Sequence, residues 1–319
     1  MTRTLRRSAW TGAVTVIFAL LLVWNITQVP TFGAFEIQTL LASTLALAYL
    51  AMAQSVVVIG GGIDLSVGAM LVLINCLSAR FMEGTSFGGS LLVAAGCLAV
   101  AAGIGALTGF VINVSKVPDI IVTLATSFVL GGVALFVLPS PGGGASPGFQ
   151  ALVLGADGTA WWPALACLVV PLLVIWLPLR RSKAGIAIFA VGSDSNAAFL
   201  SGVNPLQTKV VSYTVSGLFC GLAGLASTAF TAGGSPQATI AVTSTLASVA
   251  AIVLGGVALT GGVGGLVGPV IAVWCLYLIP NIMLGLGVDP SYGQVVGGVV
   301  VVVVVMVGGW LRLGRGKPA

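Results

Sequence analysis

The sequence predicts an all-α, polytopic membrane protein with about ten transmembrane helices and with both termini in the cytoplasm. Three observations support this fold class: hydrophobic residues make up 58% of the chain, the mean hydropathy is +1.16, and the apolar residues gather in runs of membrane-spanning length. A soluble domain is usually about 45–50% apolar, whereas one helical crossing takes roughly 20 apolar residues. We therefore expect one transmembrane domain, residues 1–319, surrounded by lipid.

Five crossings are predicted in the first half of the chain. Three arginines precede the first apolar run, but this run is longer than a signal peptide requires and has no convincing small-residue cleavage site, so we expect a retained helix. Three consecutive glycines, residues 60–62, separate the second run from the third. The five apolar runs cover residues 9–29, 37–59, 65–82, 90–114 and 120–138.

Five more crossings are predicted in the second half, where two polar stretches separate apolar runs. Residues 139–160 are rich in proline and glycine, which indicates an outer loop. Trp161 and Trp162 then open the sixth run, as expected for interfacial aromatic residues. Residues 179–209 form a basic interruption that contains four of the twelve Lys and Arg residues. The five apolar runs cover residues 161–179, 210–231, 246–259, 266–284 and 294–311.

The distribution of basic residues supports this topology independently. With ten crossings, eleven of the twelve Lys and Arg residues fall in cytoplasmic loops or termini, and only Arg80 falls outside. Membrane proteins keep their basic loops on the cytoplasmic side, and removing one crossing would move half of the loops to the opposite side. The charge pattern therefore favours ten crossings.

Composition disfavours several classes of function. The chain has no His, which is the commonest general base and transition-metal ligand. Its five cysteines lie in apolar runs without paired spacing, so we expect packing residues rather than ligands or disulfides. We also find no Gly-x-x-x-x-Gly-Lys-[Ser/Thr] phosphate loop for ATP. We expect no catalytic residues, metal or cofactor, and the net charge of +5 indicates anionic lipid rather than nucleic acid as a partner.

The most distinctive motif is Gly-Gly-Gly-Ile-Asp-Leu-Ser-Val-Gly at residues 60–68. Asp64 is one of seven acidic residues, and an ionisable group between two apolar runs indicates a functional site. Alternatively, Asp64 or Ser66 only caps the first turn of the next helix. A second glycine-rich break at residues 255–265 echoes the first, and paired breaks are typical of a substrate route between two repeats.

Neutral hydrogen-bonding side chains along such a route would suit an uncharged, polyhydroxylated solute. The same side chains often bond one helix to another, and that role is the more frequent one. With the acidic residue of the motif included, the candidate residues of the translocation path are Gln54, Asp64, Asn75, Ser216 and Asn281.

The basic interruption at residues 179–209 has two interpretations. It forms either a short surface helix that docks into a separate ATP-hydrolysing subunit or a solvated loop that only maintains the topology. The spacing of its residues favours neither interpretation over the other.

Three segments together resemble one protein family. Residues 61–68, the sequence Ala197-Ala198-x-x-x-Gly202-Val203, and Val-Leu-Gly-Gly at 253–256 followed by Gly-Gly are similar to the permease subunits of bacterial ABC importers for monosaccharides, of the ribose, xylose and galactofuranose type. The resemblance covers about residues 37–311. It implies an inner-membrane location, a pore of two permease subunits, two cytoplasmic ATPase subunits and a periplasmic sugar-binding protein. It also implies that residues 184–205 contact the ATPase, with the candidate coupling residues Ala197, Ala198, Gly202, Val203 and Asn204.

The chain departs from this family pattern at two places. Val263 stands where relatives usually carry an Arg, and residues 243–248 lack the acidic residue that relatives tend to carry there. If those charges normally pair, their joint loss favours a heterodimeric pore, in which a sister permease keeps them, over a homodimer.

The main alternative function is an ion-coupled secondary transporter of a small neutral solute. Such carriers commonly place carboxylates or His at the midplane of the membrane. In this chain only Asp64 and Asp119 lie near an apolar run, and both stand at its end. The function that the family resemblance implies is the permease of an ATP-driven importer for a monosaccharide or similar polyol.

Overall fold

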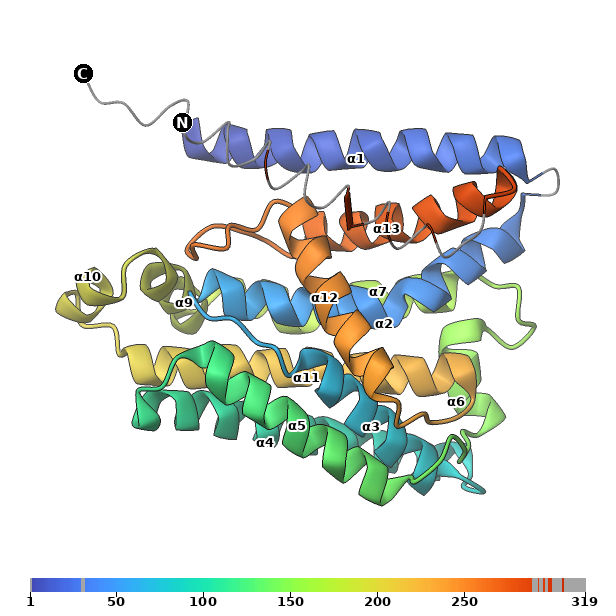
Figure 1. Ribbon diagram of the computed structural model, residues 1–319, viewed down its shortest axis with the longest axis horizontal. Coiled ribbons are helices and arrows are strands. Elements are labelled where there is room, and N and C mark those ends of the chain that lie inside the picture. The colour runs from blue at the N-terminus through green and yellow to red at the C-terminus, as the bar shows by residue number, and fades with distance from the viewer. Residues whose placement is uncertain are drawn as a thin grey trace.

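The computed structural model describes residues 2–29 and 32–288, with side chains from residue 10 onward, and beyond them only positions 292, 295, 298, 299 and 306. These residues form helices and connecting segments, and within the described ranges the only β-type pairing is an isolated bridge between Gly142 and Gly234. The predicted all-α class is confirmed for this part of the chain (Figure 1).

Two prolines interrupt the sixth predicted crossing without ending it. Pro171 and Pro178 flank a π-helical turn, Leu172–Trp176, because proline lacks the N–H group that a regular α-helical turn requires. The helices are α1 (Thr2–Gln28), α2 (Ala34–Ile59), α3 (Val67–Met82), α4 (Phe87–Ser115), α5 (Asp119–Val137), α6 (Pro147–Leu154), α7 (Trp162–Pro171), α8 (Leu177–Arg181), α9 (Lys183–Ser193), α10 (Ser195–Leu200), α11 (Pro205–Thr231), α12 (Ala238–Leu254) and α13 (Val267–Gly285).

Seven helical segments of the described chain are long and apolar enough to cross a membrane. They are α1, α2, α4, α5, the combined segment Trp162–Arg181, α11 and α13, and each coincides with a predicted crossing. Helices α3 and α12 are shorter, with 16 and 17 residues, and overlap the third and eighth predicted runs. The tenth predicted run, residues 294–311, lies outside the continuously described ranges.

The eighth predicted run, residues 246–259, is displaced in the structure. Helix α12 begins at Ala238. Two of its threonines bond their hydroxyls within the helix and so are tolerated among apolar residues: Thr243 donates to the carbonyl oxygen of Thr239 at 2.7 Å, and Thr245 to that of Ala241 at 2.9 Å. The helix ends at Leu254, before Gly255 and a left-handed glycine, Gly256 (φ +84°). The prediction was wrong at both ends.

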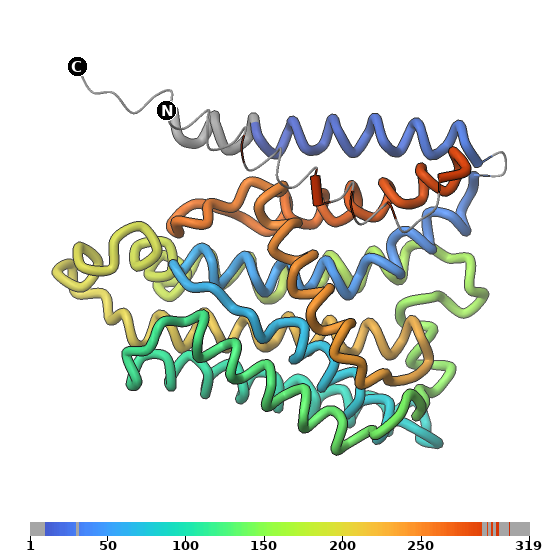
Figure 2. The backbone as a smooth tube through the Cα atoms, in the orientation of Figure 1, coloured from blue at the N-terminus to red at the C-terminus, as the bar shows by residue number. Residues whose placement is uncertain are grey.

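Helices α2 and α11 form the centre of the bundle, and most of their residues are buried. Helix α11 packs closely on α4 at two glycines. A Cβ atom at Gly105 would overlap the carbonyl oxygen of Tyr213, and one at Gly217 would overlap that of Ala101. Such close backbone approach is how small residues stabilise helix pairs in lipid. Helix α1 lies at the edge along α13, with few buried residues (Figure 2).

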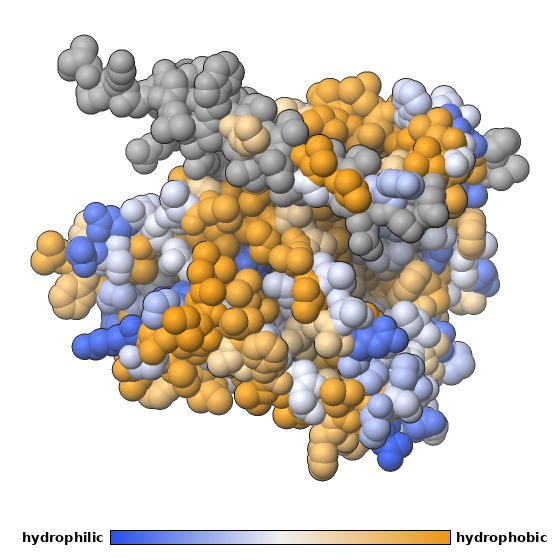
Figure 3. Space-filling model, in the orientation of Figure 1, coloured by the Kyte–Doolittle hydropathy of each residue, from blue (hydrophilic) through white to orange (hydrophobic). Residues whose placement is uncertain are grey.

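The connections gather at two opposite ends of the bundle (Figure 1). Residues 116–118, 182–204 and 255–266 lie at the end with α9 and α10, whereas residues 83–86 and 138–161 lie at the end with α6. The short helix α6 lies within residues 139–160, which were predicted as an outer loop. Between the two ends, apolar side chains cover much of the face over α5 and α12 (Figure 3).

Residues 60–66 take a different course from the other connections. They leave the α9 end of α2 and run into the bundle, so that α3 begins part-way along α2 (Figure 2). This inward course explains why α3 has only 16 residues. It also brings the polar groups of the 60–68 motif in among the helices, where every backbone and side-chain polar atom needs a partner.

Candidate translocation path and docking segment

Asp64 lies in the inward segment and is 5% exposed. Its Oδ1 accepts hydrogen bonds from the backbone N–H (2.8 Å) and the hydroxyl (2.6 Å) of Ser66, and its Oδ2 accepts from the Ser216 hydroxyl on α11 at 3.4 Å. Ser66 is the residue before α3, but its hydroxyl bonds to Asp64 and does not cap the helix. Asp64 therefore stabilises the turn of the inward segment and bonds it to α11. Asp64 and Ser216, two of the predicted path residues, are thus in contact.

A second acidic group, on α5, lies against the same segment at Gly62. Asp119, the first residue of α5, forms an ion pair with Lys209 of α11 (Nζ–Oδ1 2.6 Å) and accepts a hydrogen bond from the Tyr213 hydroxyl at 3.2 Å. A Cβ atom at Gly62 would lie 2.7 Å from Asp119 Oδ2 and 3.1 Å from the Tyr213 hydroxyl. Only glycine leaves room for this arrangement. The sequence does not reveal that these two charges pair, because they are 90 residues apart.

We expect Lys209→Met to destabilise the protein by about 1–3 kcal/mol, because it leaves the carboxylate of Asp119 largely buried without its cation. The side chains of Lys209 and Asp119 are 28% and 14% exposed, so solvent compensates only partly. Thermal melting of the purified chain measures the effect. Lys183→Met, at an exposed lysine without an ion-pair partner among the described residues, is the control and should melt as the wild type does. Equal melting of the two variants would contradict a stabilising ion pair.

Gln54 is the most isolated of the predicted path residues. It lies on α2, is 1% exposed, and neither its Nε2 nor its Oε1 has a hydrogen-bond partner among the described residues. A buried amide without partners destabilises the conformation that contains it by about 1–3 kcal/mol. Gln54 therefore does not act as a bond between helices in this conformation.

Gln54→Met is expected to raise the melting temperature of the purified chain by several degrees, because a thioether of similar length fills the space without an unsatisfied amide. Asn75→Leu is the matched control, since it removes an amide that is fully hydrogen-bonded, and it should lower the melting temperature. A Gln54→Met chain that melts at or below the wild-type temperature would contradict this account.

Asn75 and Asn281 lie away from the Asp64–Ser216 pair. Asn75 is on α3, eight residues past its first residue, which corresponds to roughly 12 Å of helix. Its Nδ2 donates to the Thr228 hydroxyl (2.8 Å) and the Gly233 carbonyl (3.0 Å), and its Oδ1 accepts from the Ser235 N–H (2.9 Å). Asn281 is on α13, which packs on α1, α2 and α12. The structure thus joins two of the five predicted residues and distributes the others along the bundle.

The two glycine-rich breaks meet each other and the end of α9. We call Gly61, Gly192, Gly261 and Gly262 the glycine junction. A Cβ atom at Gly192, in the last turn of α9, would overlap the carbonyl oxygen of Ile59 and lie 2.8 Å from the N atom of Gly262. One at Gly261 would overlap the Gly192 carbonyl oxygen and lie 3.0 Å from Gly61 Cα.

A hydrogen bond closes the glycine junction from the other side. The N–H of Gly262 donates to the carbonyl oxygen of Ile59 at 2.9 Å, which links the break after α12 to the end of α2. Backbones of three segments are therefore in direct contact, without side chains between them. The end of α9 is thus in direct backbone contact with residues 59–61 and 261–262. The similarity of the two breaks was visible in the sequence, but the position of α9 between them was not.

The basic interruption forms two helices, α9 and α10, of which α10 projects from the end of the bundle (Figure 1). Asp194 caps α10 by accepting hydrogen bonds from the N–H groups of Asn196 and Ala197, both at 2.9 Å. Phe199 and Leu200, at the end of α10, are 66% and 86% exposed. Two large apolar side chains at the tip of a surface helix are typical of a docking contact.

The five predicted coupling residues surround this tip but have different environments. Ala197 and Gly202 are exposed, and Gly202 has φ +85° with open space around it. Ala198 is buried, so it would support the tip rather than contact a partner. The Asn204 side chain caps α11, because its Oδ1 accepts hydrogen bonds from the N–H groups of Leu206 (3.0 Å) and Gln207 (3.3 Å). The N–H of Val203 donates to the Ala198 carbonyl oxygen at 3.0 Å. Phe199 and Leu200 were not selected from the sequence, although they lie inside the family motif.

Comparison with known proteins identifies the family. The chain is 32% identical over 311 residues to the ribose import permease protein RbsC of Escherichia coli K12, with 94% of each chain covered. It is 31% identical to the ribose import permease protein of Bacillus subtilis, covering 91% of this chain and 89% of that protein. It is 29% identical to the fructose import permease protein FrcC of Rhizobium meliloti, covering 88% of this chain and 79% of that protein. No solved structure matches.

These relatives are import permeases for sugars, and the chain aligns with them over nearly its whole length. A family model described as "branched-chain amino acid transport system / permease component" matches residues 36–305, which include both glycine-rich breaks, α9 and α10. The buried polar segment, the glycine junction and the exposed apolar tip thus all lie within the matched region. The chain belongs to this family of transport permeases, and within it resembles the permeases of ABC sugar importers.

Proposed function

We propose that this chain is the membrane-spanning permease subunit of an ATP-driven importer that carries a monosaccharide or a similar polyol across the bacterial inner membrane. ATP is hydrolysed by separate cytoplasmic subunits, and a periplasmic binding protein delivers the sugar. The proposal is supported by the family of the chain and by one structural feature above all: an exposed apolar helix tip, Phe199 and Leu200, at the basic end of the bundle.

The proposed orientation places α9 and α10 in the cytoplasm. The α9 end carries the cations Lys116, Arg180, Arg181 and Lys183, with Asp194 as the acidic residue of its connections, whereas the connections at the α6 end carry Glu83 and Asp157. Basic residues are retained on the cytoplasmic side, so the α6 end faces the periplasm. Among the residues whose side chains the structure describes, the α6 end carries one cation, Arg80, which forms an exposed ion pair with Glu83 at 3.7 Å.

In the proposed mechanism, ATP binding draws the two ATPase subunits together and displaces α10. Because α9 directly precedes α10 in the chain, packs against it and ends in the glycine junction, the displacement reaches both glycine-rich breaks. The first break continues into residues 62–66, which are hydrogen-bonded to α11 through Asp64. The ATPase can only shift the permease between states that it binds with different affinity, so docking at α10 and movement at the junction are both required.

The pore is proposed to contain a second permease subunit. Thr243, on α12, and Val263, which is 48% exposed in the second break, are both at the surface of the chain, where a partner subunit can contact them. Because relatives usually carry a charge near each of these positions, a sister permease that retains the charges is slightly favoured over a second copy. Purification of a functional complex that contains only this permease would exclude the heterodimer.

Reconstitution of the complex in proteoliposomes tests the function. We expect uptake of D-ribose or D-fructose that requires ATP, the ATPase subunits and the loaded binding protein together. The alternative, an ion-coupled secondary transporter, predicts uptake by the permease alone that persists after ATP depletion and collapses with the proton or sodium gradient. Sugar accumulation in vesicles that lack the ATPase would therefore overturn the proposal.

A further inference from the structure

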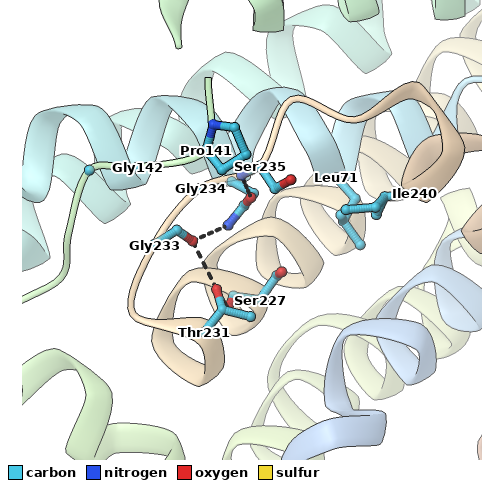
Figure 4. Close-up of a pocket in the computed structure, with 11 residues that line it drawn as sticks. Leu71, Pro141, Gly142, Ser227, Thr231, Gly233, Gly234, Ser235 and Ile240 are labelled. Atoms are coloured by element: carbon cyan, nitrogen blue, oxygen red, sulfur yellow. Dashed lines mark hydrogen bonds between the residues drawn. The ribbon is translucent and has the colours of Figure 1, made fainter. Parts of the chain in front are cut away.

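A cavity of about 290 Å³ opens at the α6 end of the bundle (Figure 4). It lies between α3, α11, the start of α12 and the two connections that precede α6 and α12. Its volume is close to the lower end of the range for small-molecule sites, roughly 300–1,000 Å³. The lining residues are Leu71, Asn75, Pro141, Gly142, Gly143, Ser227, Thr231, Gly233, Gly234, Ser235 and Ile240, none of which is charged.

Hydrogen bonds from backbone and side-chain groups hold the walls of this cavity in place. Gly142 and Gly234 bond to each other in both directions, at 3.0 and 2.8 Å, which joins the two connections. The Asn75 amide holds the second connection on α3 through Gly233 and Ser235. The Thr231 hydroxyl bonds to the Gly233 carbonyl at 2.8 Å. The cavity is therefore formed before any ligand arrives, which lowers the entropic cost of binding.

Two other hydroxyl groups line the cavity and, unlike Asn75 and Thr231, make no hydrogen bond within the described part of the chain. Ser227 on α11 and Ser235 before α12 are half-buried, and neither hydroxyl has a hydrogen-bond partner among the described residues. Figure 4 shows both oxygens turned toward the same space, opposite the side chains of Leu71 and Ile240. The site thus combines two unused donor–acceptor groups with an apolar wall.

We propose that this cavity is a binding subsite for the transported sugar, occupied as the sugar leaves the binding protein. A neutral sugar matches it chemically, because its hydroxyl groups donate to and accept from Ser227 and Ser235 while a C–H face packs on Leu71, Pro141 and Ile240. A charged solute would find no countercharge among the lining residues. The inference rests on the proposed function, which places the α6 end in the periplasm.

The experiment compares Ser227→Ala/Ser235→Ala with wild type in proteoliposomes that contain the complete complex. Uptake of D-ribose and D-fructose is measured against the concentration of loaded binding protein. Removing both hydroxyls is expected to reduce maximal uptake about tenfold, since each hydrogen bond contributes on the order of a factor of three or more. The half-saturating concentration of binding protein should not change, because docking precedes transfer of the sugar.

Two further variants separate a sugar subsite from a structural effect. Ile240→Trp, which fills the cavity from its apolar side, should reduce maximal uptake in the same way. Ser140→Ala, at an exposed serine of the same connection outside the lining, should transport as the wild type does. Each variant is checked for an unchanged melting temperature and for ATPase co-purification.

The outcomes distinguish this inference from the proposed function. If wild-type uptake depends on ATP but both cavity variants transport normally, the subsite is wrong and the function stands. A raised half-saturating concentration of binding protein with unchanged maximal uptake would assign the cavity to protein docking and also overturn the subsite. If the wild-type permease accumulates sugar in vesicles that lack ATP or the ATPase subunits, the proposed function fails and the subsite with it.

Discussion

Gly192→Ala is expected to reduce ATP-driven uptake by at least about tenfold, because the new methyl group has no space in the glycine junction. The Cβ atom would overlap the carbonyl oxygen of Ile59 and lie 2.8 Å from the backbone N atom of Gly262. Overpacking of this kind costs about 1–3 kcal/mol or displaces the backbone. Either result separates α9 from the two glycine-rich breaks and interrupts transmission from the ATPase.

The readouts for Gly192→Ala distinguish loss of transmission from loss of docking. Uptake should fall while the ATPase still co-purifies, because Phe199 and Leu200 on α10 remain exposed. Gly103→Ala on α4 is the control: no heavy atom lies within 4 Å of the new Cβ, so uptake should be unchanged. Normal ATP-driven uptake by Gly192→Ala would show that close contact between α9 and the two glycine-rich breaks is not needed. The proposed route through α9 would then be wrong.

Truncation of the helix tip by Phe199→Ala/Leu200→Ala is expected to weaken association with the ATPase by roughly 100-fold. Each side chain is mostly exposed in the isolated chain, and burial of one such side chain at an interface contributes about 1.5–3 kcal/mol. Two truncations therefore remove about 3 kcal/mol or more, and tenfold in affinity corresponds to about 1.4 kcal/mol. Co-purification and binding titration with the ATPase measure the loss, and uptake should disappear with it.

The matched control for the tip variant truncates two exposed apolar residues at the opposite end. Phe81→Ala/Leu152→Ala removes side chains of the same types, which are 59% and 41% exposed at the end of α3 and on α6. ATPase association should be unaffected by this pair. A stable permease–ATPase complex with the truncated tip, or equal loss in both double variants, would contradict docking at α10.

The positions of most long helices could be predicted because their evidence is local. Runs such as residues 90–114 and 120–138 are continuous apolar segments, and the structure extends or shifts them by only a few residues as α4 and α5. Helix α12 was displaced because threonine counts as polar in the sequence, whereas its hydroxyl bonds within the helix in the structure. Hydropathy detects the side chain but not the bond that it makes.

The candidate site was predicted in part, for the same physical reason. The Gly-Gly-Gly-Ile-Asp motif marked the segment that enters the bundle, but its partners, Ser216, Tyr213 and the Asp119–Lys209 pair, come from helices far away in the sequence. Gln54 and Asn75 were chosen as equivalent polar residues. The fold gives Asn75 three hydrogen bonds and leaves Gln54 without a partner among the described residues.

The sequence alone determined that this chain is a helical membrane protein, which end of it is basic, and where its glycine-rich breaks lie. These properties follow from composition and order along the chain, since a helix that crosses lipid bonds its backbone internally and presents apolar side chains. Only the tertiary structure decided that the two breaks meet at Gly192, that α10 exposes Phe199 and Leu200, and that two free hydroxyls share one cavity. Each of these depends on distances between segments that are remote in sequence, and those distances are determined by how closely the helices can approach.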